Sequence, residues 1–267
     1  MSSFPGGLAA HVETYRNTAD HNDRVHREFT AATAADPLLS SHRQHIEQHK
    51  LGYGDAAFHA MWKLLLAAAH ERFGRVDALE IGVFKGQVIS LWALLAKTQG
   101  WTVRVNALTP LEGQPLRGAR LWRSLKQRLL PRFRERNQSG NFYSDDDYER
   151  IVKTLFSRFG LDFSEVRLVR GYSNDRAVLD ALQADRFHIV YVDGDHTYDG
   201  AAADVRHFAP KVVAGGWLVM DDAAFDLPGT VFWKGYESVT RACALLPELG
   251  FRNVLNVGHN RVFERMR

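Results

Sequence analysis

The sequence predicts an α/β fold with a doubly wound, mostly parallel sheet of seven strands and helices on both faces. From about residue 58 to residue 225, short apolar runs typical of buried strands alternate with segments of helical periodicity. Such alternation requires right-handed crossover connections, so these strands are expected to be parallel. The last two apolar runs instead flank a short Gly-His-Asn turn, which predicts a C-terminal antiparallel hairpin at one edge of the sheet.

The predicted elements follow one another in a regular order. Residues 1–55 hold no strand-like run and are expected to form a helical N-terminal extension or cap, whereas residues 56–267 are expected to form the main domain. A basic segment at about 111–142 interrupts the alternation and is expected to be an insertion. Strands are expected near residues 76–81, 101–108, 166–171, 187–194, 215–225, 251–257 and 261–266, and helices near residues 58–74, 87–97, 144–160, 173–183 and 197–212.

The composition limits the class of protein. The chain has 267 residues, of which 45% are apolar and 24% charged, as in a globular protein with a sizeable core. Its single cysteine, Cys243, excludes an internal disulfide and fits a reducing compartment. No signal peptide or membrane-spanning run is evident, so a cytoplasmic protein without a membrane partner is expected. The net charge of +3 is too small to indicate a polyanionic partner.

The first strand ends in a Glu-x-Gly-x-x-x-Gly pattern formed by Glu80, Gly82 and Gly86. Glycines in a strand-to-helix turn let the backbone approach a ligand closely, and the following helix N-terminus favours negative charge. The spacing differs from the G-x-G-x-x-G of nicotinamide-binding proteins, and the turn lacks the Gly-Lys-Ser/Thr of a phosphate-binding loop. The pattern is compatible with a ligand-binding turn and also with a purely structural one.

Acidic residues follow two later strands. Asp193 ends the strand at 187–194, and Asp221 and Asp222 end the strand at 215–225. Because ligands of open α/β sheets bind beyond the carboxyl ends of the strands, these three carboxylates are expected to converge there. Crowded carboxylates repel unless protons or a cation compensate, and a hard divalent ion such as Mg²⁺ is the simplest solution. The alternative is that the acids are ordinary turn residues and helix caps.

The order of the segments LEIGVFKG, VRGYSND, VYVDGDHTY and GGWLVMDD resembles the class I S-adenosylmethionine (SAM) methyltransferases, which have a Rossmann-like fold. Within that class the chain looks like the metal-dependent small-molecule O-methyltransferases of the macrolide-sugar and catechol types. The resemblance covers about residues 75–225 and the terminal hairpin. It implies two cofactors, SAM and Mg²⁺ or another divalent cation.

The resemblance also implies roles for individual residues. The positions that match SAM-binding residues are Glu80, Gly82, Phe84, Gly86, Ser173, Asn174, Asp193 and Asp195, and those that match the metal ligands are Asp193, Asp221 and Asp222. His196 matches the position of the general base. An imidazole, with an unperturbed pKa of roughly 6.5, can accept a proton from a hydroxyl that a cation has acidified. One departure concerns the ribose of SAM, because Thr109 stands where an acid is expected; Glu112 or a water molecule are alternatives.

Three functions remain open from the sequence. The first is Mg²⁺-assisted methylation of a small hydroxylated molecule, with a sugar hydroxyl of a glycoside or other natural product preferred and a phenol next. The second is a catalytically altered partner or scaffold protein with the same fold. The third is a nucleic-acid methyltransferase that uses the basic segment at 115–141, but the Asn/Asp-Pro-Pro-Tyr signature of such enzymes is absent. A homo-oligomer is compatible with all three.

Two further patterns have competing interpretations. Aromatic residues after the Asp221–Asp222 pair are hypothesised to contact the acceptor; they are Phe225, Phe232, Trp233 and Tyr236. His42, His45 and His49 share one face of a predicted helix, a spacing that zinc could use, but no fourth ligand is evident.

Overall fold

The computed structural model describes residues 7–111, 128–129 and 147–266. Its sheet has seven strands in the order β3-β2-β1-β4-β5-β7-β6. They are β1 (Arg75–Ile81), β2 (Thr102–Leu108), β3 (Arg167–Val169), β4 (Phe187–Val192), β5 (Val212–Met220), β6 (Phe251–Val257) and β7 (Asn260–Arg265). Strands β1 to β5 are parallel, and β7 is antiparallel to both β5 and β6. The predicted doubly wound sheet and its terminal hairpin are therefore confirmed.

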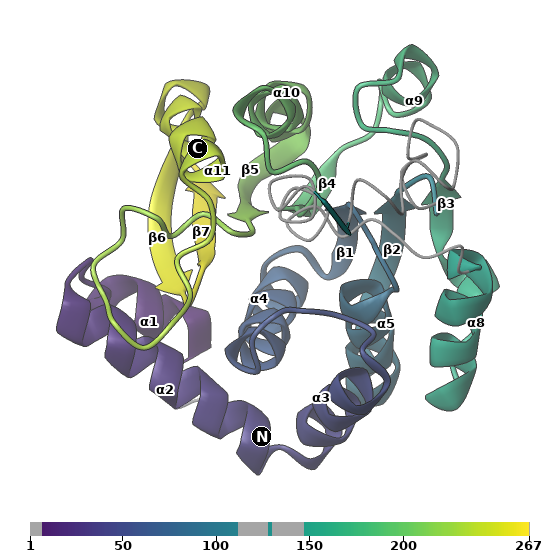
Figure 1. Ribbon diagram of the computed structural model, residues 1–267, viewed down its shortest axis with the longest axis horizontal. Coiled ribbons are helices and arrows are strands. Elements are labelled where there is room, and N and C mark those ends of the chain that lie inside the picture. Colours follow the sequence, from purple (N-terminus) through teal and green to yellow (C-terminus); the bar gives the residue numbers. More distant parts are fainter. Residues whose placement is uncertain (1–6, 112–127, 130–146, 267) are drawn as a thin grey trace.

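Helices cover both faces of this sheet (Figure 1). The α-helices among the described residues are α1 (Gly7–Thr14), α2 (Ala19–Ala35), α3 (Pro37–His49), α4 (Ala57–Phe73), α5 (Gln87–Gln99), α8 (Tyr148–Arg158), α9 (Arg176–Ala181), α10 (Tyr198–Phe208) and α11 (Glu237–Ala242). Short 3₁₀ turns occupy Phe163–Glu165, Ala209–Lys211, Cys243–Leu245 and Pro247–Leu249. None of the helices in this part of the chain is long and apolar enough to cross a bilayer. The predicted basic insertion lies almost wholly outside the described residues.

Two hydrophobic clusters hold the sheet between its helices. One joins the sheet to α4, α5 and α8, and the other joins it to α9, α10 and α11. In the first cluster the rings of Trp92 and Tyr191 pack edge-on against Trp62, with centroids 5.0 and 4.9 Å apart. Because the central parallel strands are covered on both faces, β1 is buried along six consecutive residues, which include the acids Asp77 and Glu80.

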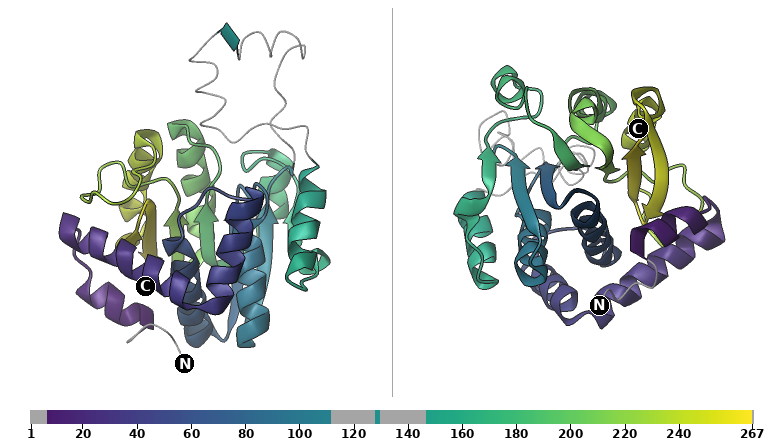
Figure 2. Two further views of the ribbon diagram at one scale, coloured as in Figure 1. Left: turned by 60° about the horizontal axis from the view of Figure 1, so that its bottom comes forward. Right: turned by 180° about the vertical axis from the view of Figure 1, so that it is seen from behind.

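The N-terminal helices pack onto the rest of the chain and do not form a core of their own. Helix α2 lies against α4 and β6, beside the C-terminal hairpin, as the two views of Figure 2 show. Val25, Phe29 and Leu39 belong to the same buried cluster as α4 and α5. The helical character predicted for this region is seen in residues 7–49, while the domain boundary near residue 55 stays a prediction.

A buried chain of hydrogen bonds ties α3 to α4 and α5. The Ser90 hydroxyl donates to the Gln87 carbonyl oxygen (3.0 Å), so it accepts from His42 Nε2, also at 3.0 Å. A neutral imidazole has only one N–H, which makes His42 Nδ1 the acceptor of the 3.0 Å bond from His59 Nε2. Burial lowers the pKa of His42 to about 3 and that of His59 well below its usual value. His42 is therefore a packing residue in this structure.

Candidate active site

A cavity of about 250 Å³ opens at the carboxyl ends of β1, β4 and β5. Six of the predicted site residues line it: Glu80, Phe84, Asp193, His196, Asp221 and Asp222. The remaining wall comes from residues 51–54, the start of α5, Trp233, Tyr236 and His259. Segments far apart in the sequence therefore meet at the edge of the sheet where the strand-end residues were expected to converge.

Gly82 is required by the close approach of two strand ends. Its φ is 92°, and a Cβ added there would lie 1.9 Å from the carbonyl oxygen of Asp193. The same turn is tied to both flanking strands, because Gly82 N–H donates to Leu108 O and Asp193 N–H donates to Ile81 O. Gly82 thus lets Asp193 sit directly over the end of β1.

Glu80 brings a carboxyl group to the floor of the cavity. Its side chain is only 2% exposed, and Oε2 has no hydrogen-bond partner among the described residues. Burial raises its pKa well above the usual range, although the backbone N–H of Ile89 partly opposes this effect by hydrogen bonding. An orphaned buried oxygen in a cavity wall is suited to a donor or a cationic group from a ligand.

The three predicted metal ligands lie together. The carboxyl groups of Asp193 and Asp221 are close enough to interact electrostatically, and Asp221 Oδ1 accepts from Asn260 Nδ2 at 2.9 Å. Burial, followed by the charges of Asp221 and Asp222, raises the pKa of Asp193 well above its usual range. Burial and the neighbouring Asp221 raise the pKa of Asp222 to about 9. Ionising Asp193 and Asp222 here is therefore favoured by a compensating positive charge.

An imidazole that was not predicted faces the same acids. Nε2 of His259 is 3.4 Å from Asp221 Oδ1 and 3.5 Å from Asp222 Oδ1. One ligand atom from each of these three residues falls within 4.8 Å of the others, so they could hold a metal ion together. His259 lies in the turn between β6 and β7, which the sequence marked only as a hairpin turn. Because β7 is antiparallel to β5, the turn before β7 lies beside the carboxyl end of β5. The predicted antiparallel hairpin could therefore have placed His259 near the acids.

His196 lies on the opposite side of Asp222. Its Nε2 is 3.1 Å from Asp222 Oδ2, and its ring stacks on Tyr236 with a centroid separation of 4.7 Å and an interplanar angle of 19°. The imidazole is thus oriented by a carboxyl group and an aromatic face while it lines the cavity. This arrangement suits a residue that must exchange a proton with a ligand.

The comparisons with known proteins agree with this geometry. A family model described as a methyltransferase domain matches residues 79–223, more than half of the chain. The chain belongs to this methyltransferase family. The matched segment contains the carboxyl ends of β1, β4 and β5 that line the cavity, from Glu80 to Asp222.

Solved structures show the same architecture. The methyltransferase resembles the O-methyltransferase NovP with a TM-score of 0.57 and 17% identity over 78% of this chain and 79% of the other. An O-methyltransferase from Bacillus cereus in complex with SAH matches with a TM-score of 0.53, 13% identity and coverages of 91% and 97%. CalS11, a TDP-rhamnose 3'-O-methyltransferase, matches with a TM-score of 0.50, 12% identity and coverages of 94% and 96%. The fold is that of class I small-molecule O-methyltransferases.

One curated protein is similar in sequence over a shorter stretch. The uncharacterized protein R132 of Acanthamoeba polyphaga mimivirus is 30% identical over 76 residues, which are 28% of this chain. The match spans about a third of that protein's length (34%).

Several residues predicted to bind SAM do not line the cavity. Gly82 and Gly86 shape the turn behind it, and Gly86 begins α5 with a φ of 87°. Ser173 and the exposed Asn174 lie in the loop after β3. Asp195 is exposed and accepts a hydrogen bond from Thr197 N–H at 2.8 Å, within the turn that starts α10.

The position expected to contact ribose is occupied by a buried threonine. The Thr109 hydroxyl accepts from Leu111 N–H at 3.2 Å, so it is used in a local turn after β2. Glu112, the suggested substitute, lies outside the described residues. Within the described part of the chain no acid takes the place of Thr109 at the end of β2.

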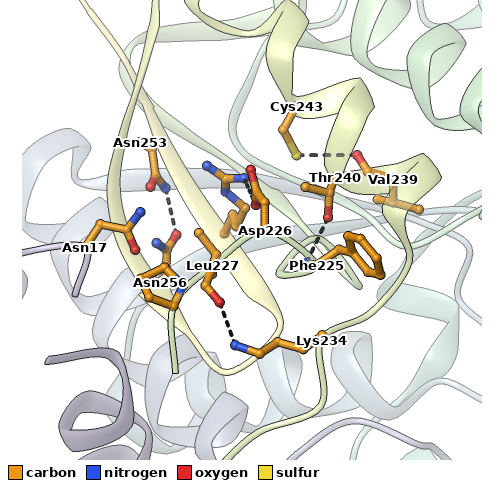
Figure 3. Close-up of polar contacts among 12 residues, drawn as sticks. Asn17, Phe225, Asp226, Leu227, Lys234, Val239, Thr240, Cys243, Asn253 and Asn256 are labelled. Atoms are coloured by element: carbon orange, nitrogen blue, oxygen red, sulfur yellow. Dashed lines mark hydrogen bonds and ion pairs between the residues drawn. The ribbon is translucent and has the colours of Figure 1, made fainter. Parts of the chain in front are cut away.

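The loop after Asp222, residues 223–236, carries the aromatic residues predicted to face the acceptor. Trp233 and Tyr236 line the cavity, whereas Phe232 is buried and Phe225 points to the surface. Lys234 Nζ bonds to the Leu227 carbonyl oxygen across the loop, as Figure 3 shows.

Helix α2 fixes the far side of this aromatic loop. Asp23 Oδ1 accepts from the backbone N–H of Thr230 (2.7 Å) and of Val231 (3.2 Å), and Asp23 Oδ2 accepts from the Thr230 hydroxyl (2.7 Å). Asn22 Nδ2 donates to Pro228 O at 2.7 Å. The N-terminal helices therefore position the loop that forms one wall of the methyltransferase cavity.

Proposed function

We propose that this methyltransferase transfers the methyl group of SAM to a hydroxyl oxygen of a small molecule, with help from a divalent cation. The observation that carries the proposal is the meeting of Asp193, Asp221, Asp222 and His196 in one cavity at the carboxyl ends of β4 and β5. A hydroxyl is a poor nucleophile at neutral pH, whereas the sulfonium of SAM is already activated. What the protein must supply is proton removal and alignment of the two reactants.

The donor is proposed to lie against the first strand end. Glu80 Oε2, buried and without a partner among the described residues, is suited to an ammonium group such as the one on the methionine part of SAM. Gly82 and Gly86 shape the turn behind this wall, because a Cβ at either position would meet Asp193 or Val152. The SAH complex of the Bacillus cereus enzyme, which has the same fold, supports SAM as the donor.

The acids at the ends of β4 and β5 fit a divalent cation. Carboxylate oxygens are the donors that such ions prefer, and burial with the charge of Asp221 raises the pKa of Asp193 and of Asp222, so a bound cation would favour their ionised forms. Asp221 and Asp222 would hold the ion, with Asp193 beside them. When bound, the ion would lower the pKa of the acceptor hydroxyl and direct its oxygen.

His196 is proposed to receive the acceptor's proton. Its contact with Asp222 and its stacking on Tyr236 hold the ring at the cavity wall. A correctly placed general base typically contributes about 10²–10⁴-fold to the rate. Phe84, Trp233 and Tyr236 supply ring faces for an acceptor, which fits either a sugar or a phenol. CalS11, named for its action on a nucleotide sugar, favours a sugar hydroxyl of a glycoside or other natural product.

Calorimetry with SAM, followed by a screen with radiolabelled SAM, tests the proposal. The screen uses panels of glycosides and phenols, each with Mg²⁺ or Mn²⁺ and with chelator. Methyl transfer that requires the cation is the expected result. Failure to bind SAM would end the proposal and leave a partner or scaffold protein of the same fold. Transfer that survives chelation would remove the cation from the reaction.

A further inference from the structure

We propose that His259 is a nitrogen ligand of the cation and that the site therefore selects a transition-metal ion such as Mn²⁺ or Co²⁺ over Mg²⁺. The proposal rests on one part of the proposed function, namely that a cation binds at Asp221 and Asp222. It replaces Asp193 by His259 as the third ligand. The donor atoms of Asp221, Asp222 and His259 lie within 4.8 Å of one another, and Asp193 is not part of this group.

The distances fit shared ligation better than a hydrogen bond. Nε2 of His259 lies 3.4 and 3.5 Å from the facing oxygens of Asp221 and Asp222, beyond the roughly 2.7–3.2 Å of an N–H···O bond. Two donors bound at about 2.1 Å to one ion are about 3.0 Å apart at the octahedral angle and about 3.4 Å apart at the tetrahedral angle. The ring nitrogen thus faces the space between the two carboxylates at the separation that one shared ion produces.

The position of the ring is fixed by its surroundings. His259 is only 7% exposed, and Phe58 and Trp233 pack edge-on against it with centroids 4.5 and 5.2 Å away. Its backbone carbonyl oxygen accepts from Ala223 N–H at 2.9 Å, which ties the hairpin turn to the residue after Asp222. A ligand held by packing from three segments is positioned before any ion binds.

Neighbouring groups support the same assignment. Asn260, the residue after His259, donates to Asp221 Oδ1 at 2.9 Å and so orients the first carboxylate. Asp193 lines the same cavity but is not one of the three residues whose donor atoms lie together. Imidazole suits transition-metal ions such as Fe²⁺, Ni²⁺ and Zn²⁺, whereas Mg²⁺ is bound almost entirely through oxygen; Mn²⁺ takes both kinds of donor and serves as the spectroscopic probe. One imidazole with two carboxylates therefore favours a transition-metal ion.

Pulsed electron paramagnetic resonance of the Mn²⁺-loaded full-length protein tests this assignment without any turnover. Protein is stripped with chelator and loaded with one equivalent of Mn²⁺, and modulation from a coordinated imidazole nitrogen is recorded. We expect the wild type to show that modulation and His259→Ala to lose it, with Mn²⁺ affinity at least about tenfold weaker. His196→Ala is the critical comparison, since His196 also contacts Asp222, and it should keep the modulation. His26→Gln, a nearby imidazole paired with Asp55, is the matched control and should also keep it.

Three results would overturn the proposal. They are a wild-type Mn²⁺ spectrum without nitrogen modulation, loss of the modulation in His196→Ala with retention in His259→Ala, and failure of the protein to bind Mn²⁺. The first needs no variant, so it holds even if His259→Ala does not fold. SAM binding, measured separately by calorimetry, tests whether SAM is the methyl donor of the proposed function. If Mn²⁺ binds through oxygen ligands alone and methyl transfer still requires a cation, the role of His259 is refuted and the proposed function stands.

Discussion

Nε2 of His196 lies 3.1 Å from Oδ2 of Asp222, so the proposed base is hydrogen-bonded to a proposed metal ligand. The other oxygen of the same carboxyl group faces His259. Asp222 can adopt this central position because its backbone is left-handed, with a φ of 53°, and its carbonyl oxygen accepts from Tyr236 N–H at 2.8 Å. The two proposed roles, proton transfer at His196 and cation binding at Asp222, would therefore be coupled through one side chain.

His196→Gln should abolish methyl transfer and leave SAM binding unchanged. The amide keeps a polar group near Asp222 but cannot accept a proton at neutral pH, so kcat is expected to fall by about 10²–10⁴-fold. Initial rates and SAM calorimetry on the same preparation check this prediction. Unchanged turnover would show that another group takes the proton.

Removing a carboxylate should remove the stabilisation by metal without destabilising the metal-free protein. Burial and Asp221 raise the pKa of Asp222 to about 9, so folding without metal at neutral pH costs the protonation of this acid; Asp222→Asn removes that cost, and in chelator its melting temperature should equal or exceed that of the wild type. Saturation of the wild type with Mn²⁺ at 100 times its Kd adds about 2.7 kcal/mol, or roughly 5–10 °C, and the variant should lack this rise. Thermal denaturation with and without Mn²⁺ measures both effects. An equal rise in the variant would place the ion elsewhere.

Asp23→Ala should loosen the aromatic loop from α2. The change leaves the two backbone N–H groups and the hydroxyl that Asp23 binds without their acceptor, at an expected cost of about 1–3 kcal/mol. Hydrogen exchange in residues 225–236 should become faster, and kcat/KM should fall while SAM affinity holds. Glu28→Gln removes a charge from an exposed position of the same helix and is the control. Unaltered exchange in the loop would contradict the anchoring role.

Gly82→Ala should destabilise the protein far more than Gly74→Ala. Both glycines have positive φ, at 92° and 71°, so both substitutions cost about 1–2 kcal/mol of backbone strain. Only at Gly82 does the new Cβ meet backbone, 1.9 Å from Asp193 O, whereas nothing lies within 4 Å at Gly74. We expect a further loss of about 1–3 kcal/mol in urea denaturation. Equal losses at the two sites would mean that the end of β4 can move away.

The His42–His59–Ser90 chain should make the protein sensitive to mild acid. Burial lowers the pKa of His42 to about 3, with His45 and Arg43 acting in the same direction. When the pH falls below about 6.5, His42 therefore becomes protonated in the unfolded chain but stays neutral in the folded protein. Stability is complete above that pH and falls as the pH drops towards 3, by about 2 kcal/mol per such histidine at pH 5. Urea denaturation at pH 7 and pH 5 should show a smaller difference in His42→Gln than in the exposed control His49→Gln.

The order of the elements could be predicted from the sequence because helix and strand periodicities are local. Each strand end that carries chemistry, from Glu80 to Asp222, follows an apolar run, and parallel strands bring such ends to one edge of the sheet. The methyltransferase family was recognised from the same segments and is confirmed by the family match over residues 79–223. The SAM-binding roles of Ser173, Asn174 and Asp195 stay predictions.

Contacts between distant residues were not predictable in the same way. His259 is 37 positions beyond Asp222, and Asp23 is 207 positions before Thr230. Neither lies in a motif, and each would be read as an ordinary turn or helix residue. Only the pairing of β7 with β5, and the packing of α2 beside the hairpin, bring them to the cavity.

By itself, then, the sequence determined the α/β architecture, the methyltransferase family and the strand ends at which acids and an imidazole gather. The tertiary structure decided which of these groups touch, that Asp222 stands between two imidazoles, and that an N-terminal helix holds the aromatic loop. The physical reason is that periodicity and turn chemistry act over a few residues, whereas a site is built from side chains that the folded sheet brings within a few ångströms of one another.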